Sequence, residues 1–117
     1  MKSLYEQVGG EPTLETMIDR LYARLTTDPV VQHHFLPHRV PEIKRQQRRW
    51  FRSVLGGSDE SDRPDLEAAH RDLDITDEDV RIVLGHLDGA FAEAGVGEEL
   101  RVKINAVVAR LWYARHF

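Results

Sequence analysis

Hydrophobic residues recur along this chain at intervals of three and four, which places them on one face of an α-helix. Runs that alternate apolar and polar residues, the signature of β-strands, are nearly absent. The pattern predicts helices over residues 4–8, about 12–26 and about 41–55, a short helix from Pro64, and two helices that begin after Thr76 and near Glu98. The sequence therefore predicts an all-α fold.

Signals for helix ends support these assignments. Ser3 can cap the first helix, and Thr76 with Asp79 resembles a capping box in which aspartate replaces the usual glutamate. Glycines that stop helices follow the first, third and fifth predicted helices, at Gly9-Gly10, Gly56-Gly57 and Gly95. The segment between residues 57 and 64 is polar and is expected to be a loop.

Composition narrows the class of protein. The chain has 117 residues, a formal net charge of -4 and no cysteine, so thiolate metal sites and disulfides are excluded. No apolar run approaches the roughly 20 residues that a membrane-spanning helix needs. We expect a single soluble cytoplasmic domain over residues 1–117, without a membrane span.

The short helix from Pro64 carries a histidine where apolar residues are expected. Leu66, His70 and Leu73 are spaced four and three residues apart, so they share the inward face. A lone inward histidine is more often an ordinary core residue than a ligand. His70 by itself therefore does not indicate a binding site, and further polar residues on inward faces are needed to support one.

Two other inward stripes each contain one polar residue. Gln47 lies in the stripe of the third predicted helix, and Tyr22 lies in that of the second. Their apolar companions are Val40, Ile43, Trp50 and Val54 around Gln47, and Leu14, Ile18, Leu21 and Leu25 around Tyr22. A buried amide without partners costs about 1–3 kcal/mol, so something must satisfy Gln47.

Together these three residues indicate a polar group inside the core. An imidazole on one side and hydrogen-bond donors on the other would suit a haem with a bound diatomic gas, because haem iron takes a neutral imidazole nitrogen as axial ligand. A tyrosine hydroxyl and a glutamine amide can both donate hydrogen bonds. Phe35 could pack against the porphyrin plane.

Five segments in order carry a family resemblance: "LYEQVGG", "LYARLTTDPVVQHHF", "IKRQQRRWFRSVLGG", "AAHRDLDIT" and "VLGHLDGAFAEAGV". With them the chain resembles the truncated haemoglobins, the group I branch in particular. The resemblance implies a globin-like two-over-two helical sandwich that encloses one haem b, iron protoporphyrin IX. The tryptophan that marks group II in the fifth helix is missing, since that region reads "IVLGHL".

The resemblance also implies roles for individual residues. His70 takes the place of the proximal iron ligand, and Tyr22 and Gln47 take the places of the distal donors. Further haem or pocket residues are Phe35 beside the haem, Ile43 at the distal gate, Trp50 and Phe51 along the pocket or its access route, and Leu66, Ile75, Val80 and Val83 as apolar neighbours. Lys44 and Arg48 are candidates for the haem propionates.

Two segments depart from the family pattern. The loop "SDESDRP" stands where the group I branch carries an aromatic-Thr-Gly element, which affects packing at the haem edge but not the axial ligand. The ending "LWYARHF" is rich in aromatic residues and has no assigned role.

The implied function is reversible O2 binding. Family members are also credited with converting nitric oxide and O2 to nitrate, which needs a separate electron donor or reductase. CO is a further expected ligand, and storage, transport, sensing or a peroxidase-like role stay open. No nucleic acid is expected as a partner.

Two alternatives remain. A basic stretch interleaved with aromatic residues could contact phosphate, but its aromatic side chains fall on the inward stripe, which favours a solvated basic face. Its cations are Lys44, Arg45, Arg48, Arg49 and Arg52. A helical interaction module without cofactor is the second alternative, and it would leave Gln47 and His70 unexplained.

The remaining histidines receive structural assignments. His33, His34 and His38 are expected to form a wet surface cluster, because no acidic or third ligand lies nearby in sequence. His86 is expected on a helix face, hydrogen-bonded to backbone or solvent.

Overall fold

The computed structural model describes residues 2–64 and 75–114, and within them the chain is helical without a β-strand. The α-helices are α1 (Leu4–Val8), α2 (Glu11–Leu25), α3 (Val40–Val54), α5 (Asp77–Glu93) and α6 (Glu98–Ala114). Each of these lies within one or two residues of its predicted position. The predicted short helix with Leu66, His70 and Leu73 lies outside the described residues.

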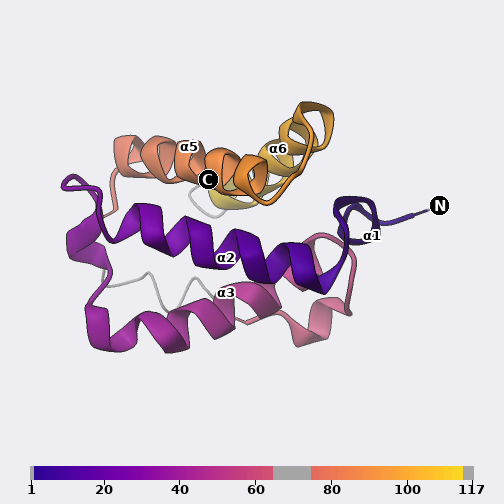
Figure 1. The fold of residues 1–117 in the computed structure, drawn as a ribbon, viewed down its shortest axis with the longest axis horizontal. Helices are drawn as coiled ribbons and strands as arrows, with labels where there is room; N and C mark the ends of the chain where they lie inside the picture. The colour runs from indigo at the N-terminus through magenta and orange to yellow at the C-terminus, as the bar shows by residue number, and fades with distance from the viewer. Residues whose placement is uncertain (1, 65–74, 115–117) are drawn as a thin grey trace.

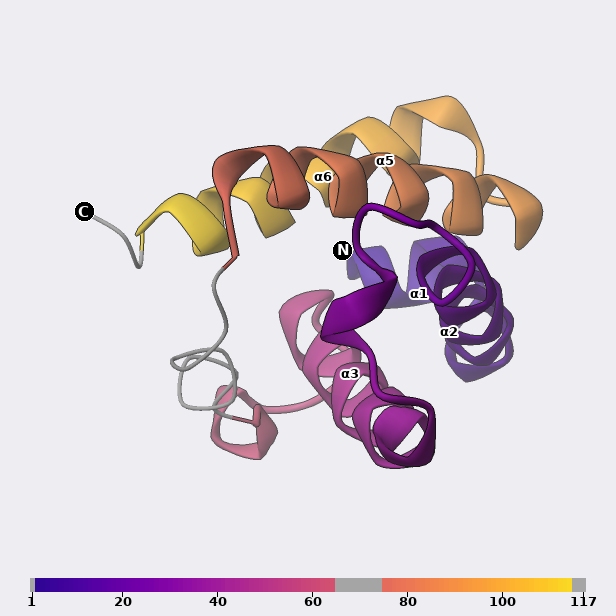
Figure 2. The same ribbon diagram turned by 90° about the vertical axis from the view of Figure 1, so that its left-hand side faces the viewer.

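Two pairs of helices form the body of the molecule (Figures 1 and 2). α2 packs against α3 on one side and against α5 on the other, and α5 packs against α6. Turned by 90°, the ribbon shows α5 and α6 together above α2 and α3. The all-α prediction is confirmed, and the helix pairs enclose the space in which the predicted site residues gather.

Within residues 2–64 and 75–114, three short 3-10 turns lie between these helices, at Gln32–His34, Pro37–Arg39 and Glu60–Asp62. The last of them lies inside the segment that was predicted to be a plain polar loop. The backbone just before this turn is anchored to α3, because the hydroxyl of Ser53 donates to the backbone carbonyl of Asp59 at 3.1 Å.

The predicted caps are present. The Ser3 hydroxyl accepts from the backbone N–H of Glu6 at 3.2 Å, and Gly9 ends α1 at φ 114°, a left-handed conformation that favours glycine. At the start of α5 the Thr76 hydroxyl accepts from the N–H of Asp79 at 3.0 Å. The Asp79 carboxylate in turn accepts from the N–H of Thr76 at 3.3 Å, which completes the capping box.

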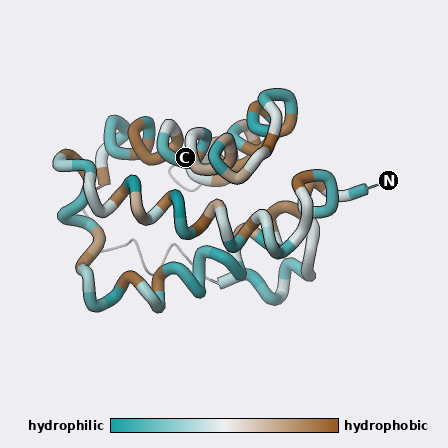
Figure 3. Tube along the Cα trace, in the orientation of Figure 1, coloured by the Kyte–Doolittle hydropathy of each residue, from teal (hydrophilic) through white to brown (hydrophobic). Residues whose placement is uncertain are grey.

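The core follows the apolar stripes of the helices. Hydrophobic positions recur along α2 and α5, whereas α3 is hydrophilic over much of its length (Figure 3). Among the described residues the largest fully buried side chains are Phe91, Leu14, Met17, Leu25, Leu55, Ile104 and Val31. Phe91 meets Phe51 edge to face with ring centroids 6.3 Å apart, an arrangement that aromatic quadrupoles favour.

The basic stretch of α3 is engaged more than a solvated face would be. Lys44 pairs with Asp19 of α2 at 2.6 Å, and the Arg52 guanidinium donates to the Glu11 carboxylate at 3.0 Å. The hydrogen bond from Arg52 holds the pKa of Glu11 below its usual range. Acidic groups of α2 thus compensate part of this charge, which weakens the nucleic-acid alternative.

Candidate functional site

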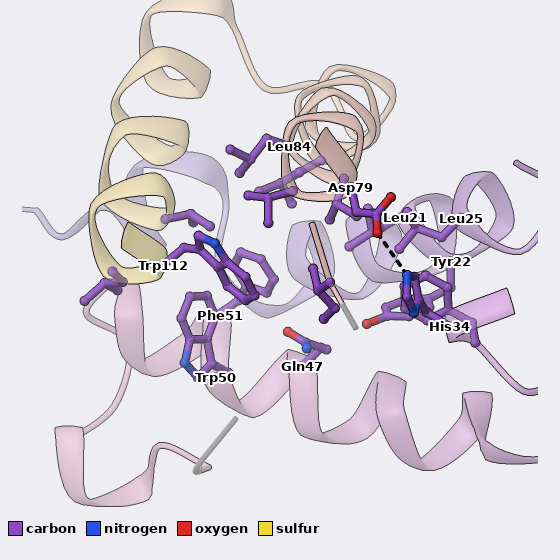
Figure 4. A pocket seen from close by; sticks show the side chains of 17 residues that line it. Leu21, Tyr22, Leu25, His34, Gln47, Trp50, Phe51, Asp79, Leu84 and Trp112 are labelled. Carbon is purple, nitrogen blue, oxygen red and sulfur yellow. Dashed lines mark hydrogen bonds and ion pairs between the residues drawn. The ribbon is translucent and has the colours of Figure 1, made fainter. Parts of the chain in front are cut away.

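A cavity of about 160 Å³ lies between the two helix pairs. One ordered water needs roughly 10–15 Å³ on this measure, so the space is far larger than a packing defect. Its walls are mostly apolar, and 17 of the described residues line it (Figure 4). Predicted site residues among them are Tyr22, Phe35, Gln47, Trp50, Phe51, Ile75, Val80 and Val83.

Some predicted site residues are not brought to this cavity. Ile43 is partly buried and packs against the core without lining the cavity. Lys44 and Arg48 lie in a separate charged groove with Glu15 and Asp19, where Arg48 pairs with Glu15 at 3.5 Å. Both cations therefore pair with carboxylates of α2, and their role at the haem propionates stays a prediction. His70 and Leu66 lie outside the described residues.

Tyr22 supplies a hydroxyl to the cavity from a buried position on α2. Only 4% of the residue is exposed, and its ring meets that of Phe35 edge to face at 5.7 Å. Burial raises the pKa of the hydroxyl well above its usual range, so the group stays protonated. It makes no hydrogen bond with the rest of the described chain, which leaves an O–H donor directed into an apolar space.

Gln47 supplies an amide from α3 on the facing wall. The residue is half-buried and its amide is without a hydrogen-bond partner across residues 2–64 and 75–114. Figure 4 shows its polar end and the hydroxyl of Tyr22 directed into the same space. Two donors from two helices therefore face a cavity with apolar walls, which suits a small polar guest held by hydrogen bonds.

The opposite end of the cavity is aromatic (Figure 4). Trp50 and Phe51 meet edge to face at 5.0 Å, and Trp112 and Leu111 of α6 add to the same wall. The sequence alone indicates no role for the aromatic ending of the chain, to which Trp112 belongs. Trp112 follows Val108 by four residues, so continuing the inward stripe of α6 by one turn would have found it.

A histidine and an aspartate at the Tyr22 end were missed. The prediction of a wet cluster holds for His33 and His38, which are exposed, and is wrong for His34. The side chain of His34 is 9% exposed, and its Nε2 lies 3.2 Å from Oδ2 of Asp79. Both residues line the cavity. No spacing in the histidine cluster indicates this partner, because 45 residues separate the two.

His86 also differs from its prediction. Its Nε2 lies 2.6 Å from Oδ2 of Asp28, and its Nδ1 accepts from Nε of Arg24 at 3.1 Å. Side chains of other elements therefore satisfy this ring, rather than backbone or solvent. His86 does not line the cavity.

The cavity fits a haem better than a bare metal ion. Over the described residues no cluster of three or more His, Cys, Asp or Glu side chains could hold a metal ion. A flat apolar cofactor instead matches the apolar walls, and the two unpartnered donors match a gas bound beside it. None of the described helices is long and apolar enough to cross a bilayer.

Comparison with known proteins agrees with this geometry. Residues 3–116 match the bacterial-like globin family, and the chain belongs to that family. The resemblance to truncated haemoglobins is thereby confirmed, and membership of the globin family implies haem binding.

Relatives include both branches that the sequence analysis distinguished. A group 1 truncated haemoglobin of Mycolicibacterium paratuberculosis is 28% identical over 93% of this chain and 80% of its own length. A group 2 truncated haemoglobin of Bacillus subtilis is 30% identical over 83% of this chain and 75% of its own.

Solved structures show the same fold. The haemoglobin of Chloroflexus aurantiacus superposes with a TM-score of 0.76 at 32% identity, and the match covers 92% of each chain. The truncated haemoglobin of Tetrahymena pyriformis superposes with a TM-score of 0.85 over 93% of each chain, at 20% identity.

Proposed function

We propose that this chain is a haem b protein that binds O2 reversibly in the cavity between the helix pairs. His70 is the proposed axial ligand, by its match to the family motif. Phe35, Ile75, Val80 and Val83 would contact the cofactor. The observation that carries the proposal is the pair of unpartnered donors, Tyr22 and Gln47, directed into an apolar cavity.

Haem supplies an iron that binds diatomic gases, and the chain determines how long a gas stays. The Tyr22 hydroxyl donates a hydrogen bond to the guest, and its raised pKa keeps the proton in place. Gln47 donates to Tyr22 or to the guest itself. The apolar walls exclude water, which would otherwise compete for these donors. Hydrogen bonds to a group with developing charge contribute about 1.5–3 kcal/mol.

The same pocket is proposed to convert nitric oxide and O2 to nitrate. A haem bound in this pocket would supply one electron to that reaction, so a separate electron donor would have to reduce it again. Stopped-flow mixing of nitric oxide with the oxygenated protein tests this activity, with nitrate as the expected product. If O2 is only displaced and no nitrate forms, the dioxygenase proposal is wrong, while O2 binding stands.

Substituting one tyrosine tests the distal assignment. Tyr22→Phe removes the hydroxyl and keeps the ring, and O2 release is expected to become at least about tenfold faster. Tyr113→Phe is the matched control, because Tyr113 lies exposed on α6. An unchanged release rate in Tyr22→Phe would contradict the assignment of Tyr22 as the donor to the gas.

A further inference from the structure

A continuous series of side-chain contacts leads from the start of α5 to Tyr22. Asp79 bonds to His34 at 3.2 Å. The His34 ring meets Phe35 edge to face at 6.4 Å, and Phe35 meets Tyr22 in the same manner at 5.7 Å. Both ring separations lie in the range over which aromatic pairs attract. Figure 4 shows Asp79, His34 and Tyr22 together at one end of the cavity.

Asp79 fixes the orientation of the His34 ring. Its Oδ2 accepts from both the backbone N–H of Thr76 and the His34 ring. These two hydrogen bonds, with the Thr76 contribution the larger, hold the pKa of Asp79 below its usual range. An ionised carboxylate can only accept, so Nε2 of His34 carries the proton of this bond. The ring is thus tied to a carboxylate that the backbone N–H of Thr76 holds in place, independently of the Thr76 hydroxyl.

We propose that His34 and Asp79 are positioning residues that hold the Tyr22 hydroxyl in place through the Phe35 ring. This inference rests on the proposed function of Tyr22 as the donor to the bound gas. The pair is suited to that role because both side chains are nearly buried and line the cavity itself. A shift of His34 would be passed to Phe35, its neighbour in the chain and in space.

The experiment measures the C–O stretching frequency of the haem-loaded protein with CO, because this band responds to hydrogen-bond donation in the pocket. His34→Gln and Asp79→Asn are expected to move the band part of the way toward its position in Tyr22→Phe. Asp79→Glu keeps both the carboxylate and the preferred capping-box residue, and it is expected to restore the wild-type band.

Two controls separate positioning from a loss of stability. Thr76→Ala removes the cap hydroxyl without removing either member of the pair. His86→Gln disrupts a histidine–aspartate pair that does not line the cavity. Both are expected to lower the Tm and to leave the C–O band at its wild-type position.

The outcomes distinguish this inference from the function on which it rests. If wild type binds haem and Tyr22→Phe moves the band while His34→Gln leaves it unchanged, the positioning role is wrong. If Thr76→Ala moves the band as far as Asp79→Asn does, the capping box alone accounts for the effect and the role is also wrong. If Tyr22→Phe does not move the band, the proposed function fails first. Should Asp79→Asn not bind haem, His34→Gln decides the question, because it leaves the capping box intact.

Discussion

Two histidine–aspartate pairs occur among the residues that the structure describes, and they differ in what surrounds them. His86 bonds to Asp28 through one ring nitrogen and accepts from Arg24 at the other, and Arg24 also pairs with Glu93 at 3.4 Å. Its ring is saturated by protein groups away from the cavity. The network joins the end of α2 to α5.

The ring of His34 is bonded at Nε2 only, as far as the described chain shows, and it lines the cavity. The comparison shows that a histidine–aspartate pair is not itself a functional signature. The two pairs differ in their surroundings: a guanidinium donates to the second ring nitrogen of His86, whereas His34 lines the cavity. We therefore expect the pair of His86 to govern stability and the pair of His34 to govern the pocket.

Acid should weaken both histidine–aspartate pairs, and of the changes predicted below it should cause the largest loss of stability. Hydrogen bonds from His86 and from the backbone of Val30 lower the pKa of Asp28, and Thr76 and His34 lower that of Asp79. Carboxyl groups with depressed pKa values stabilise the fold above their unfolded pKa of 3.8, and this contribution is lost as the pH falls through the folded value. Denaturant titrations should show nearly constant stability from about pH 5 to about pH 9 and a decline below about pH 4.

Substituting each carboxylate in turn shows how much of the loss of stability in acid comes from Asp28 and how much from Asp79. Asp28→Asn and Asp79→Asn should each lower stability near pH 7 and flatten part of the acid slope. If both variants keep the wild-type slope, neither pair contributes to acid unfolding, and the depressed pKa values are wrong.

Alkaline pH should separate the pocket from the rest of the molecule. Burial raises the pKa of Tyr22, so its contribution is complete below the unfolded tyrosine pKa of 10.0 and is lost as the pH rises above it. Stability should therefore decline above about pH 10, and less steeply in Tyr22→Phe. The stability of Tyr113→Phe should decline with pH as that of wild type does. If Tyr113→Phe and Tyr22→Phe flatten the decline equally, the effect does not come from the burial of Tyr22.

Removing each histidine compares the two pairs directly at neutral pH. His86→Gln is expected to reduce the free energy of unfolding by on the order of 1 kcal/mol, because two hydrogen bonds at a partly exposed site are weakened. His34→Gln should reduce it less, since its ring makes one such bond. Chemical denaturation of both variants measures the difference, and a larger loss for His34→Gln would reverse the assignment of the structural role.

Two glycines of α5 give the smallest and sharpest test. A Cβ on Gly89 would lie 2.6 Å from the Arg24 guanidinium carbon, whereas one on Gly85 would meet nothing within 4 Å. Gly85→Ala should therefore stabilise the protein by about 0.5–1 kcal/mol through helix propensity. Gly89→Ala should gain less, because it displaces Arg24 from His86. Equal gains would mean that the contact with Arg24 contributes nothing.

Local patterns were sufficient to predict much of the fold. The three-and-four spacing of apolar residues located the described helices, and Thr76 with Asp79 was recognised as a capping box that the structure contains. These features depend on residues within a few positions of one another. The polar interruptions at Tyr22 and Gln47 also indicated which side chains would meet in the cavity.

Long-range pairing is what the sequence did not reveal. The partners of His34 and His86 lie 45 and 58 residues away, and no periodicity connects them. The ion pairs of Lys44 and Arg48 were also not anticipated, because they depend on how α3 lies against α2. Such contacts follow from the packing of elements, which the spacing within one element does not specify.

The central claim is that the chain binds haem with His70 as the axial ligand. A hemin titration followed by absorption tests it most directly. Wild type is expected to bind one haem per chain with a sharp Soret band, and His70→Ala should lose that band or shift it. A wild-type protein that stays colourless with hemin, or a His70→Ala variant with the wild-type spectrum, would contradict the claim.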